Sequence, residues 1–243
     1  NPWAAGQAHT LGPDSATSAW AFITPCHWQI DQAQVTLIDP QALALTDDES
    51  RALLAAMQPY FEEDGITLIF DSAVRWLARG ELFRDLASAS LQRVVGRDLK
   101  PWMPASSKLR RLQNEMQMLL YAHPVNDART ARRALPVNSI WVSGSGALVD
   151  APPPGVQAPI VPQQLAQAAL QQDWQTWGQA WQALDANDCA ALLAALDQGS
   201  DSVQLTLCSE QHAQTYTLER HRGWARIARA LKPPSLTDAW SRL

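Results

Sequence analysis

The sequence predicts an α/β fold with a mixed sheet and flanking helices, because segments of strand character alternate with amphipathic helices. The β-rich run Ala33–Ile38 precedes a helical segment, and a second β-rich run, Ile66–Phe70, follows it. Of the 243 residues, 47% are hydrophobic and 18% are charged, which is typical of a folded globular protein. A chain of this length can bury one large core or two smaller ones.

The helix between these two strands has the clearest start. Thr46 precedes Glu49 by three residues, which is the spacing of a capping box, so we expect a helix from this point to about Tyr60. Leu53 and Met57 lie on one face of that helix and are expected to be buried.

The central part of the chain predicts a second helix and a third strand. Ser106 and Ser107 can cap a helix over Lys108–Tyr121. Ser139–Ser143 is rich in β-forming residues and runs into a predicted glycine loop, Ser143–Gly146.

Three regions are expected along the chain: an α/β region over 1–150, a proline-rich connector over 151–162, and a more helical part over 163–243. The last region is rich in Ala, Gln and Trp, and its predicted elements are helices, a strand pair and a short basic helix. These are Gln163–Leu184 with a break near Gln172, Ala186–Leu196, the strands Val203–Ser209 and Thr215–Arg220, and the basic helix after Gly223.

Charge and cysteine usage exclude several classes of protein. A net charge of −5 and a pI near 5.5 argue against general nucleic-acid binding. No apolar run reaches membrane-spanning length, so no membrane contact is expected. The first residues lack the pattern of a signal peptide, and Cys26, Cys189 and Cys208 form no Cys-x-x-Cys motif. We therefore expect reduced thiols and a cytoplasmic protein.

The segment Leu109–Gly146 contains two Pro-Val-Asn tripeptides twelve residues apart, together with a basic run. Guanidinium groups suit phosphate or carboxylate, and glycine loops offer backbone N–H donors to anions. A ligand pocket for a small anionic metabolite is one interpretation. A half-buried helix followed by asparagine turns is the other. The predicted ligand-binding residues are His123, Asn126, Arg129, Asn138, Ser143 and Ser145.

The motifs HPVNDAR at His123–Arg129 and PVNSIW at Pro136–Trp141, followed by a Gly-x-Gly, resemble archaeal-type cofactor-independent phosphoglycerate mutases of the alkaline phosphatase superfamily. In more detail the chain resembles the RpfE-type bacterial regulatory proteins, which belong near that group. The segments that carry this second resemblance are EDG, ASLQRVVGR, WMP and QNEMQMLLYAHPVN, at Glu63–Gly65, Ala89–Arg97, Trp102–Pro104 and Gln113–Asn126.

The resemblance implies a phosphoglycerate-mutase-like fold, whose active members hold two divalent metals and a serine or threonine that becomes phosphorylated. None of the five histidines lies in an Asp-His arrangement. Where the family places an Asp-His after a late strand, the chain reads Leu-Cys-Ser-Glu at Leu207–Glu210. The expectation is therefore a non-catalytic regulatory or ligand-binding protein with no metal and no cofactor.

Two alternatives stay open. The chain is a metal-dependent mutase or phosphatase if its metal ligands lie upstream of Asn1 or among residues interpreted otherwise. It is a protein-interaction module if the stripe of Trp174, Trp177 and Trp181, spaced i, i+3, i+7 on one helix face, is exposed rather than part of a core.

Overall fold

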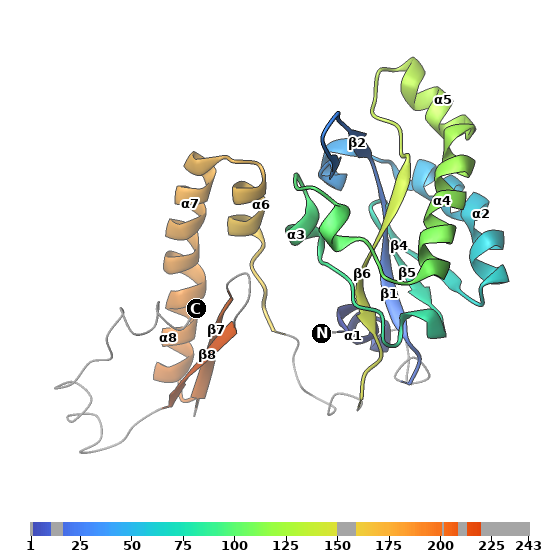
Figure 1. Ribbon diagram of the computed structural model, residues 1–243. Coiled ribbons are helices and arrows are strands. Elements are labelled where there is room, and N and C mark those ends of the chain that lie inside the picture. The colour runs from blue at the N-terminus through green and yellow to red at the C-terminus, as the bar shows by residue number, and fades with distance from the viewer. Residues whose placement is uncertain (1, 11–16, 150–158, 201, 209–212, 220–243) are drawn as a thin grey trace. The chain divides into compact units, whose positions relative to one another are not determined.

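The computed structural model describes residues 2–10, 17–149, 159–200, 202–208 and 213–219 (Figure 1). The chain divides into two compact units, residues 1–159 and 160–243, which are described separately. Most of the predicted connector, residues 151–158, lies outside the described residues.

The first unit is built on a four-stranded antiparallel sheet with the order β4-β5-β1-β6 (Figure 1). β1 pairs with β6 from Cys26 opposite Ser139 to Trp20 opposite Gly146, which joins segments more than a hundred residues apart. Helices flank this sheet, so the predicted α/β class is confirmed. The strands are β1 Trp20–Cys26, β4 Thr67–Ser72, β5 Arg75–Arg79 and β6 Ser139–Gly146.

Helices α2 (Asp47–Glu63) and α4 (Ser107–Tyr121) cover one face of the sheet (Figure 1). Alternate residues of the strands point toward these helices and form the main core with them. The helices contribute Leu53, Met57, Phe61, Leu109, Leu112, Met116 and Leu120, and the strands contribute Ile23, Trp76, Ala78, Ile140 and Val142.

The predicted caps of both helices are present. The Thr46 hydroxyl accepts a hydrogen bond from the Glu49 backbone N–H at 3.3 Å, and the Glu49 carboxylate accepts one from the Thr46 N–H at 3.1 Å. Ser106 accepts a hydrogen bond from the Leu109 N–H and begins α4. These reciprocal bonds satisfy backbone donors that a helix start otherwise leaves unpaired.

The other face of the sheet is covered by shorter elements. The alanines of α1 (Trp3–His9) pack against Trp20 and Leu77. Next to them, Cys26 and Trp141 pack against a small hairpin and a loop that carries a single helical turn. These elements are β2 Trp28–Ile30, β3 Val35–Leu37, α3 Leu91–Val94 and η4 Lys100–Trp102. Two further single turns, η2 Pro40–Leu43 and η3 Glu81–Phe83, place Leu43 and Phe83 in the main core instead.

The predicted glycine loop Ser143–Gly146 is wrong, because β6 continues through Gly146. Gly144 has a φ of 59°, and the pairing with β1 shifts register here, so the strand is irregular but remains paired. A Cβ at Gly144 would lie 2.9 Å from the Phe22 ring, so glycine is needed for this close approach. The glycines serve strand pairing rather than a loop.

The second unit contains helices, one short π-helical segment and a β-hairpin. The predicted helix break near Gln172 is confirmed, and this residue has a positive φ of 56°. The predicted strand pair is confirmed as the hairpin, whereas the predicted basic helix after Gly223 lies outside the described residues. The elements are α6 Gln164–Leu170, α7 Trp174–Leu184, η5 Asp185–Cys189, α8 Ala190–Asp197, β7 Ser202–Cys208 and β8 Ala213–Glu219.

Candidate functional site

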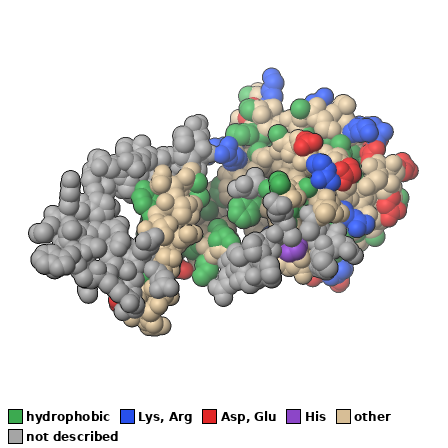
Figure 2. Space-filling model, turned by 90° about the horizontal axis from the view of Figure 1, so that it is seen from below, with side chains coloured by type: hydrophobic (Ala, Val, Ile, Leu, Met, Phe, Trp, Pro, Cys, Tyr) green, Lys and Arg blue, Asp and Glu red, His purple; other side chains and the backbone are tan. Residues whose placement is uncertain are grey.

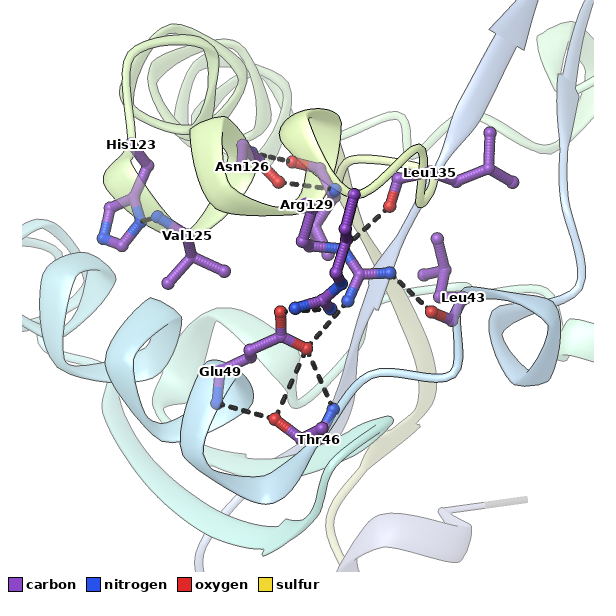
Figure 3. Close-up of polar contacts among 10 residues, drawn as sticks. Leu43, Thr46, Glu49, His123, Val125, Asn126, Arg129 and Leu135 are labelled. Atoms are coloured by element: carbon purple, nitrogen blue, oxygen red, sulfur yellow. Dashed lines mark hydrogen bonds and ion pairs between the residues drawn. The ribbon is translucent and has the colours of Figure 1, made fainter.

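His123 precedes a short helix that was not predicted from the sequence. Its Nδ1 accepts a hydrogen bond from the Val125 N–H at 3.2 Å, which makes it the N-cap of α5 (Pro124–Ala131; Figure 3). The predicted helix over 108–121 is present as α4 and ends at Tyr121, and α5 begins directly after it. Pro124 sits in the first turn of α5, where proline loses no hydrogen bond, so the first Pro-Val-Asn is helical rather than a turn.

Asn126 connects the two Pro-Val-Asn tripeptides. Its side-chain amide donates to the carbonyl oxygens of Leu120 and Val137, at 2.8 and 2.7 Å, and accepts from the Val137 N–H at 2.8 Å. The residue is only 6% exposed. A buried amide that is satisfied in this way fixes the end of α4 and the second tripeptide relative to each other.

Asn138 plays a similar part at the next step of the chain. Its side chain accepts from the Trp28 N–H at 2.7 Å and donates to the Trp28 carbonyl at 2.9 Å. Nearby, Nδ1 of His27 donates to the Pro136 carbonyl at 2.8 Å. Each asparagine of the repeat therefore forms hydrogen bonds with both the N–H and the carbonyl of one other residue, Asn126 with Val137 and Asn138 with Trp28.

Arg129 points from α5 toward α2 and is fully buried (Figure 3). Its guanidinium donates to the Glu49 carboxylate at 2.8 Å, to the Leu135 carbonyl at 2.8 Å, and to the Leu43 carbonyl. Arg132, which is half exposed, reaches the other oxygen of the same carboxylate at 2.6 Å. The cation predicted to bind an anionic ligand thus has an anionic partner within the chain.

Glu49 pairs with Arg129 and Arg132, a contact that the sequence did not predict. Burial pushes its pKa up, but hydrogen bonds from Thr46 and Arg132 and the charges of Arg129 and Arg132 outweigh that effect. The pKa of Glu49 therefore lies below its ordinary value. The capping box already accounted for an acid at this position, so no local signal pointed to an arginine 80 residues away.

Ser143 and Ser145 lie on the distal part of β6. Ser143 is buried. The hydroxyl of Ser145 donates to the Leu86 carbonyl at 2.6 Å and forms a 2.7 Å hydrogen bond with Ser88. A strand rises about 3.3 Å per residue, so Ser145 lies about 23 Å from Asn138. The structure groups Asn126, Arg129 and Asn138 in one hydrogen-bonded region and places the two serines apart from it.

A shallow depression of about 750 Å³ lies between α2 and α4. None of the six predicted ligand residues lines it. In its wall, Arg111 pairs with Asp64 at 2.6 Å, so part of its charge is neutralised. The lining residues are Tyr60, Ser107, Arg110, Arg111, Asn114, Glu115, Met118 and Leu119.

The second unit exposes the predicted aromatic stripe. Trp174, Trp177 and Trp181 of α7 are 65%, 36% and 44% exposed. Their rings meet edge to face, with centroids 6.3 and 5.9 Å apart, so they form one continuous surface. We call these three residues the tryptophan face.

Charged residues on the first unit are of both signs and interspersed on the side drawn in Figure 2. Within the part of the chain that the structure describes, no three His, Cys, Asp or Glu side chains lie close enough together to hold a metal ion. Likewise, no described helix is long and apolar enough to cross a membrane.

No protein-family model and no curated protein sequence matches this chain. Among solved structures, a cofactor-independent phosphoglycerate mutase from Thermoplasma acidophilum DSM 1728 is similar, with a TM-score of 0.40 and 14% sequence identity. The match covers 54% of this chain and 38% of that one, so the chain spans well under half of that mutase. A similarity at this level carries no argument about activity or ancestry.

Proposed function

We propose that this protein is a non-catalytic regulatory protein, of phosphoglycerate-mutase-like and RpfE-type descent, that acts by binding another protein. The exposure of the tryptophan face carries the proposal. Tryptophan is among the residues that contribute most binding energy at protein interfaces, and Trp174, Trp177 and Trp181 form one surface on α7.

The contacts of the central segment support a scaffold role for the Pro-Val-Asn repeat. Asn126 and Asn138 use their amides on backbone groups, and Arg129 uses its guanidinium on Glu49 and two carbonyls. An anion would have to displace these buried contacts, which costs their full desolvation penalty. Binding of a small phosphorylated metabolite at this segment is therefore disfavoured relative to protein contact.

The chemistry of α7 indicates the kind of partner. The helix has no charged residue between Trp174 and Leu184, and residues 159–200 include four aspartates and no lysine or arginine. An apolar face with an acidic surround suits an amphipathic helix that is apolar on one side and basic at its edges.

The test places a photo-crosslinking amino acid at position 177 in the source cell, with position 179 as the matched control. Gln179 is exposed on the same helix but points away from the tryptophan face. We expect one cross-linked protein at position 177 and none at 179. The purified partner should then bind the full chain, and Trp177→Gln should weaken its Kd about tenfold while Gln179→Ala does not.

Equal cross-linking at the two positions, or a reconstituted complex that ignores Trp177→Gln, would overturn the proposal. Titration calorimetry with phosphorylated three-carbon acids tests the competing ligand role. Millimolar or tighter binding that Arg129→Met abolishes in a folded protein would restore a metabolite site to the central segment.

A further inference from the structure

We infer that two copies of this chain pair through their β4 strands, which joins the two sheets across a two-fold axis at Ile69. β4 (Thr67–Ser72) is an edge strand, because the order of the sheet is β4-β5-β1-β6. In the middle of this edge, the apolar residue Ile69 is 37% exposed. The inference concerns the first unit and goes beyond the proposed function, which uses α7 of the second unit.

The backbone groups of Leu68 and Phe70 point away from the sheet. The Gly80 N–H donates to the Ala19 carbonyl at 3.0 Å, so alternate residues of β5, counted from Gly80, turn their N–H and carbonyl groups toward β1. Leu68 and Phe70 lie opposite two of these residues, so their own N–H and carbonyl groups face the outer edge of β4. No hydrogen bond from a described residue reaches these outer groups.

This direction of the backbone groups suits an antiparallel copy of the same strand. With the axis at Ile69, Leu68 lies opposite the partner's Phe70, and Phe70 lies opposite the partner's Leu68. Each of these pairs can exchange two backbone hydrogen bonds, which satisfies every outer N–H and carbonyl of both residues. Ile69 then lies opposite the partner's Ile69 in a non-hydrogen-bonded pair, where the Cα atoms are about 4.5 Å apart and the side chains meet.

The charges on the same face of β4 as Ile69 are complementary under this axis. Thr67, at one end of the face, lies beside the exposed Arg79 of β5. Asp71 lies at the other end, where its carboxylate is partly exposed and accepts from Gln7 at 2.9 Å. The axis places the partner's Asp71 opposite Thr67, about 10 Å from the Arg79 Cα, a distance that the two side chains span. Opposite charges around an apolar centre therefore favour a second copy in this register.

The middle of β4 lacks the features that usually prevent pairing at a sheet edge. Edge strands are commonly protected by a lysine, a proline or a bulge. The middle of β4 reads Leu68-Ile69-Phe70, and its bulge lies at the end of the strand, between Phe70 and Ser72. The bulge limits the new ladder to the middle of the strand and leaves that part open to a partner.

Helix α2 extends the contact beyond the strands. Leu68 and Phe70 pack beneath this helix, and the Arg51 guanidinium lies 3.6 Å from the centre of the Phe70 ring. Since α2 covers β4, the same axis brings the two α2 helices near each other. Ala55, one turn after Arg51 on the same side of α2, is exposed and small, which permits a close approach.

The first experiment measures the mass of the full chain by light scattering after gel filtration. We expect a dimer, with twice the 26.7 kDa of one chain. Ile69→Lys should raise its dissociation constant at least about tenfold, because two lysines would face each other at the axis. The matched control is Ile30→Lys in β2, where the isoleucine is 79% exposed. This control and Trp177→Gln should both leave the dimer intact.

A disulfide tests the register of the two strands. In a chain with Cys189→Ser and Cys208→Ser, the buried Cys26 is the remaining native thiol. Adding Ile69→Cys should link two chains under mild oxidation, because this residue faces its own copy. Adding Thr67→Cys instead places the thiols about 13 Å apart along the strand, so the link should form at least about tenfold more slowly.

Three results would overturn the inference: a wild-type chain that stays monomeric at high micromolar concentration, a dimer that Ile69→Lys leaves intact, or equal cross-linking at positions 67 and 69. Circular dichroism of each variant establishes that the fold is retained. These measurements use the isolated chain, so their failure leaves the photo-crosslinking test at position 177 unaffected.

Discussion

Replacing Arg129 with methionine tests whether the central segment is an internal scaffold. The side chain is fully buried, and its guanidinium donates to Glu49 and to the carbonyls of Leu43 and Leu135. Methionine keeps much of the length and apolar volume but removes all of these donors. Glu49 keeps its ion pair with Arg132. The main loss is therefore the donor to two buried carbonyl oxygens and the buried positive charge beside Glu49.

Removing one member of a buried ion pair costs about 3–5 kcal/mol. We expect the free energy of unfolding of the first unit to fall by that amount in Arg129→Met. The matched control is Arg132→Met, because Arg132 contacts the same carboxylate but is 50% exposed. A half-exposed pair contributes at most about 1 kcal/mol.

Urea denaturation of the full chain, followed by tryptophan emission, measures both variants. Trp76 and Trp141 are buried in the first unit and report on its unfolding. A cost below about 1 kcal/mol for Arg129→Met, or equal costs for the two variants, would refute the reasoning. Arg129 would then be free to serve a ligand.

Three further predictions concern the same unit. The pKa of Glu49 is lowered in the folded state, so its ionised carboxylate contributes fully to stability above the unfolded pKa of about 4.3. That contribution is lost as the pH falls from there through the folded pKa. Glu49→Gln should therefore reduce the loss of unfolding free energy on acidification, as measured by urea titrations at a series of pH values. Burial raises the pKa of the Cys26 thiol, so native protein treated with a thiol reagent should be labelled at the exposed Cys208 and not at Cys26. Rapid labelling of both cysteines would contradict the buried placement of Cys26. Ser50 accepts a 2.8 Å hydrogen bond from the buried Trp76 ring N–H. Ser50→Ala should therefore lower the free energy of unfolding by about 1–3 kcal/mol, measured by thermal or urea unfolding, and an unchanged stability would show that the bond is absent.

Local signals explain which elements the sequence predicted. The capping box of Thr46 and Glu49 and the Ser106 cap specify helix starts through contacts three residues apart, and both are present. β1 was missed because Pro25 stands near its end, and proline argues against a central strand. The structure accommodates it because β5 pairs with β1 only as far as Ile23, so on that side Pro25 loses no ladder bond.

The candidate site shows the same limit more sharply. The sequence drew attention to the Pro-Val-Asn repeat, but it did not indicate which groups its side chains contact. Asn126 holds a backbone eleven residues away, and Asn138 holds one 110 residues away. Whether a polar side chain faces a ligand or the chain itself depends on such distant partners, which sequence spacing does not encode.

The sequence by itself determined the α/β class, the helix caps, the break before α7 and the spacing of its tryptophans, because each depends on residues within a few positions of one another. Tertiary structure alone decided that Arg129 is neutralised by Glu49, that the glycines of β6 pair with β1, and that Trp174 is exposed. These outcomes depend on which segments meet in space and on the water they exclude, and burial sets the strength of every charge and hydrogen bond involved.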